Sequence, residues 1–121
     1  MRAPVPPPIT GHTRLFAILA DPVAHVRTPQ AINAHFARIG FDGVLVPMHV
    51  SASDLPTVVA ALRRVRNFGG FIVTVPHKVA IAALVDELPA DARAIGAINA
   101  VRREADGRLV GAMLDGVGFV E

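Results

Sequence analysis

The chain has 121 residues, of which 52% are hydrophobic, and a formal net charge of +2. Its length fits one domain with one core, and two independent cores would be unusual at this size. No apolar run reaches the roughly 18 residues that a membrane-spanning helix needs. The absence of cysteine excludes disulfides and thiolate metal sites. We therefore expect a cytoplasmic protein with no membrane partner.

The basic side chains cluster at Arg63, Arg64 and Arg66. Nucleic-acid-binding domains combine basic clusters with aromatic residues that stack on bases, and this chain has neither tryptophan nor tyrosine. We expect no nucleic-acid partner and interpret the cluster as the solvated face of a helix. The five histidines show no metal-ligand spacing, so no metal site is expected.

Residues 1–12 are rich in proline, and we expect them to form a flexible, extended segment. The folded domain is expected over residues 13–121. It begins with an apolar run at residues 15–19, which predicts a buried strand ended by an Asp-Pro turn.

A first helix follows this strand. Thr28 is a favourable N-cap and Pro29 suits the first helical position. The apolar face of the helix has Ile32, Phe36 and Ile39, and Gly40 is placed to end it.

A second strand is expected over residues 44–50, and Ser51 or Ser53 can cap the helix after it. The apolar stripe of that helix has helical spacing and consists of Leu55, Val58, Val59, Leu62 and Val65. A Gly-Gly pair then closes the segment, before a third strand at residues 71–75.

The last part predicts a helix over residues 77–88, a short helix over 90–95, and strands over 97–103 and 108–114 joined by an Asp-Gly turn. Crossover helices favour parallel strands with right-handed connections. The expected fold class is therefore α/β, a three-layer α-β-α sandwich with a mixed, mainly parallel sheet and a closing β-hairpin.

Two charged residues at strand-to-helix junctions are candidates for chemistry. Lys78 lies in the first turn of a predicted helix, where the helix dipole and partial burial would disfavour its ammonium form and suit it to acid–base work. It also fits a solvated surface lysine. Asp115 could hold a substrate hydroxyl beside a lysine, or could be a simple turn residue.

Three uncharged residues have similar alternatives. Asn99 lies in an otherwise apolar strand, and a buried amide needs partners, which a polar ligand or the neighbouring backbone would supply. Thr28 is an N-cap, or faces a carboxylate at the helix N-terminus. Thr74, inside an apolar strand, leaves the same choice open.

Four segments carry a further pattern. They are residues 21–29 (DPVAHVRTP), 73–78 (VTVPHK), 96–99 (GAIN) and 106–119 (DGRLVGAMLDGVGF). In this order and spacing they resemble the motifs of the shikimate dehydrogenase family, with Asn33 and Phe36 continuing the first motif. The resemblance covers residues 13–121.

The resemblance implies the substrate-binding domain of an NADP-dependent oxidoreductase that interconverts 3-dehydroshikimate and shikimate in aromatic amino acid biosynthesis. Lys78 and Asp115 match the catalytic pair of the family. Thr28 matches the second of two serines that bind the substrate carboxylate, while Thr74 and Asn99 match substrate contacts. The implied partner is a shikimate-like cyclic hydroxy acid, and a homodimer is compatible with the family.

Several positions depart from the family pattern. The first carboxylate-binding serine is Val26, and the asparagine before the V-T-V-P motif is Ile72. Met113 and Leu114 replace the N-T pair before the aspartate. Each change removes a polar contact, which can cost about 1–3 kcal/mol. Shikimate, quinate or another cyclic hydroxy acid therefore remain open as substrates, as do NAD and NADP as cofactors.

The family's dinucleotide-binding domain should begin where this chain stops. Gly116 and Gly118 are not followed by the third glycine and the helix of a dinucleotide loop. We expect NADP in the complete enzyme but no cofactor bound to, and no activity from, this chain alone. The end at Val120-Glu121 favours a fragment over a stand-alone domain. The alternative function is a non-catalytic module that binds a small hydroxy acid.

Overall fold

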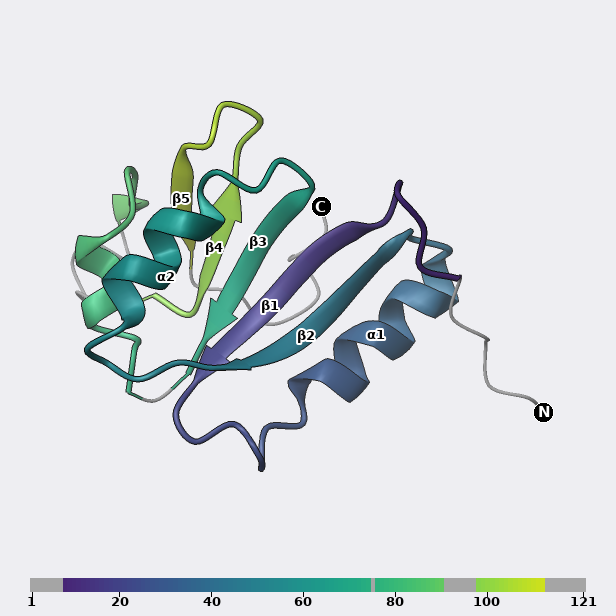
Figure 1. Ribbon diagram of the computed structural model, residues 1–121, viewed down its shortest axis with the longest axis horizontal. Helices are drawn as coiled ribbons and strands as arrows, with labels where there is room; N and C mark the ends of the chain where they lie inside the picture. The colour runs from purple at the N-terminus through teal and green to yellow at the C-terminus, as the bar shows by residue number, and fades with distance from the viewer. Residues whose placement is uncertain (1–7, 75, 91–97, 113–121) are drawn as a thin grey trace.

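The computed structural model describes residues 8–74, 76–90 and 98–112. Five strands form one sheet in the order β2-β1-β3-β4-β5 (Figure 1). They are β1 Arg14–Ala20, β2 Gly43–His49, β3 Phe68–Val73, β4 Ala100–Arg103 and β5 Leu109–Ala112. The first three strands are parallel, and β4 is antiparallel to β3 and β5. Within these ranges no helix has the length and apolar composition to cross a membrane.

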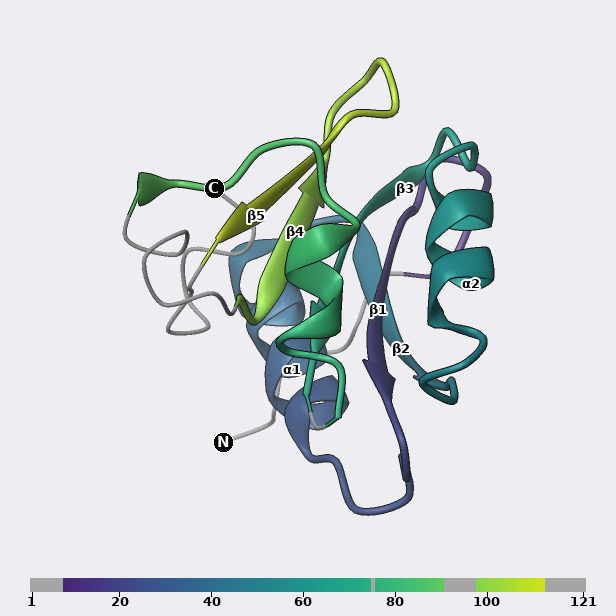
Figure 2. The same ribbon diagram turned by 90° about the vertical axis from the view of Figure 1, so that its left-hand side faces the viewer.

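Helices cover both faces of the sheet (Figure 2). Helix α1, Thr28–Ile39, packs on one face, around Phe16, Ile18 and Leu45. Helix α2, Leu55–Leu62, and the single 3-10 turn η1, Ala80–Ala83, pack on the other. The predicted α-β-α sandwich with a mixed sheet and a closing hairpin is thereby confirmed.

Strand β1 lies at the centre of the parallel part of the sheet and is buried from residue 16 to residue 20. A parallel strand covered on both faces has a continuous apolar run instead of an alternating one. Phe16 and Ile18 face α1, while Ala17 and Leu19 face α2. The strand predicted from the uninterrupted apolar run at residues 15–19 is therefore confirmed.

The predicted helix caps are wrong in detail. Thr28 is the first residue of α1 instead of its N-cap, which is Arg27, and no side chain caps the helix. The N-cap of α2 is Asp54, while Ser51 accepts the N–H of Asp54 at 3.3 Å. Gly40 ends α1 as predicted, in the left-handed conformation at φ 69°. Ile32 and Phe36 are buried as predicted, but Ile39 is 52% exposed.

The Gly-Gly pair belongs to β3 instead of preceding it. Gly69 falls at a bulge where β1 and β3 shift register, and a Cβ there would lie 2.5 Å from the ring of Phe16. Gly70 has φ 155°, and its Cβ would lie 2.4 Å from the carbonyl oxygen of Val101. Glycine therefore allows β3 to approach both neighbouring strands at this point.

The helix predicted over residues 77–88 is wrong in extent, because only η1 forms there. The backbone N–H groups of Asp86 and Glu87 donate to Leu109 O, at 2.8 and 3.2 Å. This segment thus pairs with the β5 edge. Pro89 contributes, because a residue before proline avoids the helical region.

The closing hairpin forms as predicted, but β4 begins at Ala100, so Ile98 and Asn99 precede the strand that was expected to contain them. The N–H of Gly107, at φ 91°, donates to Glu104 O, and the carboxylate of Asp106 accepts the N–H of Arg108 at 3.0 Å. Most of the short helix predicted over residues 90–95, and the predicted strand residues 97, 113 and 114, lie outside the described residues.

Candidate active site

The carboxyl ends of β1, β2 and β3 lie at the same edge of the sheet, the lower edge in Figure 1. Backbone hydrogen bonds continue beyond the strands there: Val50 donates to Ala20 O at 3.0 Å, and Thr74 donates to Leu19 O at 3.3 Å. Ligands of open α/β sheets bind at this edge, so the strand topology makes it the expected location of a ligand site.

Three of the predicted site residues meet around the end of β3. Thr74 follows the strand directly, and its carbonyl accepts the N–H of His77 at 2.9 Å. The Asn99 carbonyl accepts the N–H of Val73 at 2.9 Å. The Lys78 carbonyl accepts the N–H of Ile98 at 3.2 Å. The structure therefore brings the segments of Thr74, Lys78 and Asn99 together through their backbones.

Lys78 is exposed and lies in a turn before η1, not in the first turn of a long helix. The four-residue η1 has no dipole comparable with that of an eleven- or twelve-residue helix. Neither burial nor a helix dipole thus supports the acid–base role that we expected from position alone. The proposed role of Lys78 rests on its motif and on the edge at which it lies.

His77, next to Lys78, is a residue that the sequence did not single out. Its side chain is fully buried, and Nε2 lies 2.7 Å from Val50 O. Because a carbonyl oxygen only accepts, Nε2 donates this hydrogen bond, while Nδ1 is buried with no partner among the described residues. This hydrogen bond ties the turn that carries Lys78 to the end of β2. In the sequence, only the place of His77 within the motif at residues 73–78 could have indicated that its side chain has a structural role.

Thr28 lies at the same edge, because α1 returns antiparallel to the strands and begins there (Figure 1). Its side chain is half-buried. The connection from β1 to α1 is held by Asp21, whose carboxylate lies 2.7 Å from Nε2 of His49 at the end of β2. Thr28 therefore lies near the carboxyl ends of the parallel strands, on the face of the sheet that α1 covers.

Val26 and Ile72, the two departures from polar family positions, both pack against the apolar cluster beneath α1. Ile72 pairs with Ala100 of that cluster across β3 and β4. The replacements are therefore accommodated by apolar contacts on the α1 face. Asp115, Met113 and Leu114 lie outside the described residues, so the distance from Lys78 to Asp115 stays a prediction.

The described residues do not fit a dinucleotide. Such a cofactor needs a glycine-rich turn between a strand and a helix N-terminus. The connection from β1 to α1, residues 21–27, contains no glycine, and it is followed by the helix whose N-terminus bears Thr28. In the described ranges there is also no group of three or more His, Asp or Glu side chains that could hold a metal ion.

Comparison with known proteins identifies the family of the chain. The family described as shikimate dehydrogenase substrate binding domain matches residues 18–101. This chain belongs to that family. A shikimate dehydrogenase (NADP(+)) of Geobacter metallireducens is 46% identical over 112 residues, which cover 93% of this chain and 38% of that protein. The chain thus spans less than half the length of this shikimate dehydrogenase.

Solved structures extend the comparison. Shikimate 5-dehydrogenase from Listeria monocytogenes, in complex with shikimate and NAD, has a TM-score of 0.83 at 35% identity, covering 96% of this chain and 39% of the other. The ligand-free 5-ketofructose reductase of Gluconobacter sp. strain CHM43 has a TM-score of 0.79 at 32% identity, covering 88% and 38%. The shikimate dehydrogenase fold therefore also serves a reductase with another substrate.

Proposed function

We propose that this chain is the substrate-binding part of an NADP-dependent shikimate dehydrogenase-like oxidoreductase that interconverts 3-dehydroshikimate and shikimate. The observation that carries the proposal is the meeting of Thr74, Lys78 and Asn99 at the carboxyl edge of β3. These residues come from two separate motifs, which are joined by the backbone hydrogen bonds from Val73 N–H to Asn99 O at 2.9 Å and from Ile98 N–H to Lys78 O at 3.2 Å. The family membership of the chain supports the same activity.

In the proposed reaction the substrate ring lies across this edge. Thr28 binds its carboxylate, and Thr74 and Asn99 contact its polar groups. Lys78 Nζ, with Asp115 beside it, accepts the proton of the substrate hydroxyl during oxidation and returns it during reduction. NADP, held by other parts of the complete enzyme, would supply the hydride acceptor and donor for the carbon that bears this hydroxyl. A cytoplasmic location and a homodimer belong to the same proposal.

Replacing Lys78 by methionine in the complete enzyme tests the catalytic role. A positioned general acid–base group contributes about 10²- to 10⁴-fold, so kcat should fall by that factor while KM for shikimate changes little. Arg38→Met is the matched control, because Arg38 is also an exposed cation but lies in the last turn of α1, at the other end of that helix from Thr28. A Lys78→Met enzyme within tenfold of the parent kcat would contradict the assignment.

The 121-residue chain alone should bind shikimate without oxidising it, because its described residues do not fit NADP. Calorimetric titration measures the binding, and NADPH absorbance measures turnover. NADP-dependent turnover by this chain alone would show that its residues hold the cofactor after all.

A related enzyme with a different cyclic or keto substrate is the second candidate. The apolar packing of Val26 and Ile72 favours it, since each replaces a side chain that would donate a hydrogen bond. The double variant Val26→Ser/Ile72→Asn should bind shikimate more tightly, by roughly five- to a hundredfold for each restored contact. It should also be less stable, because Ile72→Asn places an amide against an apolar cluster. If shikimate affinity is unchanged, these two positions do not face the ligand.

A further inference from the structure

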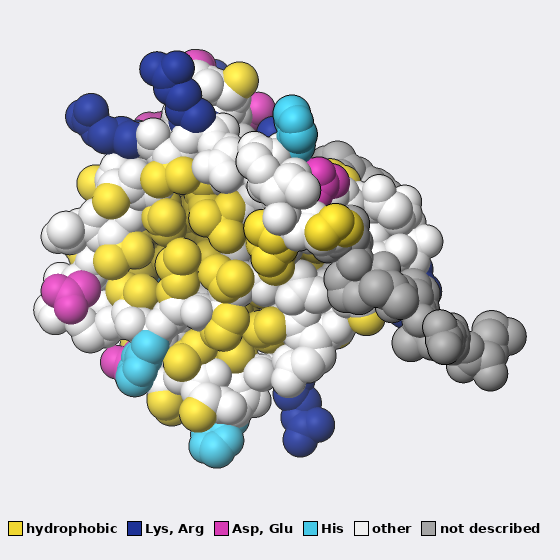
Figure 3. Space-filling model, turned by 45° about the vertical axis from the view of Figure 1, so that its right-hand side comes forward, with side chains coloured by type: hydrophobic (Ala, Val, Ile, Leu, Met, Phe, Trp, Pro, Cys, Tyr) yellow, Lys and Arg dark blue, Asp and Glu magenta, His cyan; other side chains and the backbone are white. Residues whose placement is uncertain are grey.

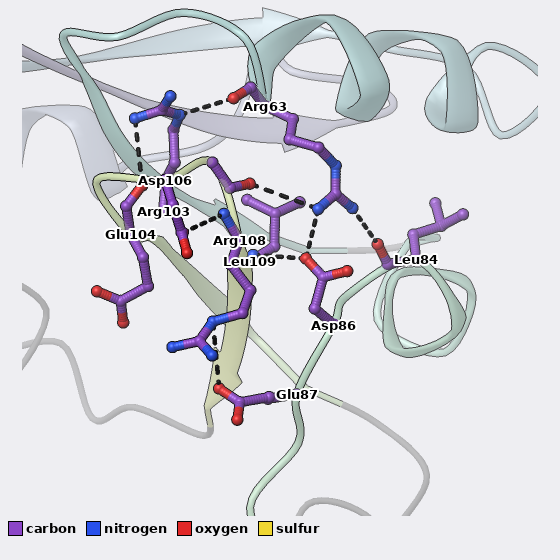
Figure 4. Close-up of polar contacts among 10 residues, drawn as sticks. Arg63, Leu84, Asp86, Glu87, Arg103, Glu104, Asp106, Arg108 and Leu109 are labelled. Atoms are coloured by element: carbon purple, nitrogen blue, oxygen red, sulfur yellow. Dashed lines mark hydrogen bonds and ion pairs between the residues drawn. The ribbon is translucent and has the colours of Figure 1, made fainter.

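A groove of about 830 Å³ lies at the opposite edge of the sheet from the candidate active site. It is formed by the end of α2, the segment after η1 and the β4–β5 hairpin (Figures 1 and 4). The strands between the two edges have six or seven residues, which corresponds to about 20 Å. A ligand in the groove would therefore take no part in chemistry at Lys78.

The groove is strongly basic. Five arginines and two aspartates line it, so its formal charge is +3, compared with +2 for the entire chain. The arginines are Arg63, Arg64, Arg66, Arg103 and Arg108. We had expected the cluster at residues 63–66 to be the solvated face of a helix. That prediction is wrong, because α2 ends at Leu62 and the cluster follows it. The charge of the domain is thus concentrated at one place.

Two of these arginines are neutralised by neighbouring carboxylates (Figure 4). Arg63 forms an ion pair with Asp86 and also donates to Leu84 O at 3.3 Å. Arg108 pairs with Glu87 at 3.7 Å. The backbone N–H of Leu109 and the Arg63 guanidinium hold the pKa of the Asp86 carboxyl below its usual value. The Asp86 carboxylate is therefore occupied by Arg63 and the Leu109 N–H, and it does not pair with the remaining arginines.

The other three arginines have no carboxylate partner within the described part of the chain. Arg64 and Arg66 are exposed, and no ion pair involves them there. Arg103 is only 8% exposed, yet its Nε and Nη1 groups donate to carbonyl oxygens alone, those of Arg63 at 2.9 Å and Glu104 at 3.3 Å. A nearly buried guanidinium is costly unless an anion pairs with it.

Arg103 lines the groove and keeps one donor group without a partner among the described residues. Its Nη2 group makes no hydrogen bond to the described residues and lies beside Gly107 in the groove wall, 3.9 Å from where a Cβ of residue 107 would be. Guanidinium groups bind phosphate oxygens with two parallel hydrogen bonds.

We propose that this groove binds a phosphate-bearing small molecule, with Arg64, Arg66 and the Nη2 group of Arg103 as its anchors. The volume is within the range of small-ligand sites, and the three arginines without a carboxylate partner suit a pyrophosphate or a phosphate ester better than a single carboxylate. The site is separate from the proposed substrate site and does not depend on it.

Calorimetric titration of the protein with sodium pyrophosphate, at low ionic strength in chloride buffer, tests the proposal. The groove variant is Arg64→Ala/Arg66→Ala, and both side chains are exposed, so the fold should persist. The control is Arg27→Ala/Arg38→Ala, which removes two exposed arginines of the α1 region and gives the same net charge. We expect saturable binding that weakens at least about tenfold in the groove variant and less than about twofold in the control.

Three outcomes would overturn the proposal: no saturable binding by the parent, equal weakening in both variants, or tighter binding of a short DNA duplex than of pyrophosphate. The last would assign the groove to nucleic acid. Backbone NMR separates this test from that of the proposed function. Pyrophosphate should shift the amide signals of Gly107 and Arg108, and shikimate those of Thr74 and Lys78, and either response can fail while the other is observed.

Discussion

Replacing Asn33 by alanine should loosen α1, the helix that begins with Thr28. The Asn33 side chain donates to Leu45 O at 2.9 Å and accepts the Leu45 N–H at 2.8 Å. Each bond contributes about 1 kcal/mol, and alanine regains about 0.6 kcal/mol through its helix propensity. The free energy of unfolding should therefore fall by about 1.5–2.5 kcal/mol, because part of the cost is the unpaired backbone of buried Leu45.

Urea denaturation followed by circular dichroism measures this loss of stability. In thermal unfolding, Tm should fall by about 5–10 °C. Asn67→Ala is the control, since exposed Asn67 makes a single 3.5 Å hydrogen bond to Thr13 O and its loss should cost less than about 0.5 kcal/mol. If the two variants lose equal stability, the side chain of Asn33 does not anchor α1 to β2 in solution.

The isosteric variant Asn33→Asp sharpens the test. Its carboxylate can still accept the Leu45 N–H, but its second oxygen would face Leu45 O. This repulsion should raise the pKa of the new carboxyl in the folded state above its unfolded value of about 3.9. The penalty relative to the parent should thus be small below pH 4 and grow as the pH rises through the folded-state pKa. A penalty independent of pH would contradict the geometry.

Three further substitutions have defined outcomes. Asp86→Asn should lower stability slightly at pH 7, and the difference from the parent should vanish as the pH falls below about 4, because the lowered pKa stabilises the fold only while the carboxyl is ionised. Gly70→Ala should cost more than about 2 kcal/mol in urea denaturation, since its Cβ would meet Val101 O. His77→Phe should lower the free energy of unfolding by about 1–3 kcal/mol, because it leaves the carbonyl oxygen of buried Val50 without its hydrogen-bond donor. A loss below about 0.5 kcal/mol would show that this hydrogen bond does not hold the turn to the end of β2.

The fold could be predicted from the sequence where one local signal agreed with the tertiary packing. The run at residues 15–19, the helix that ends at Gly40 and the Asp-Gly turn are examples. The helix expected over residues 77–88 failed because the N–H groups of Asp86 and Glu87 bond to Leu109, some twenty residues away. Periodicity contains no information about such a partner.

The candidate site was found by motif order and not by local physics. Lys78 is exposed and outside any long helix, so position alone gave it a role for the wrong reason. The proximity of Thr74, Lys78 and Asn99 depends on the antiparallel pairing of β3 with β4, which no single segment encodes. The buried hydrogen bond of His77 depends on Val50, 27 residues earlier.

The contacts of β2 have a consequence for self-association. Residues 43, 45 and 47 direct their backbone groups away from β1, at the open edge of the sheet, where another strand could add. Gly43 N–H is taken by Phe41 O at 3.0 Å, both groups of Leu45 are taken by Asn33, and Pro47 has no N–H. A strand added at this edge would therefore meet almost no free backbone N–H group. A homodimer of this chain should therefore not form by continuing the sheet across β2, and the same edge should resist fibril-like stacking.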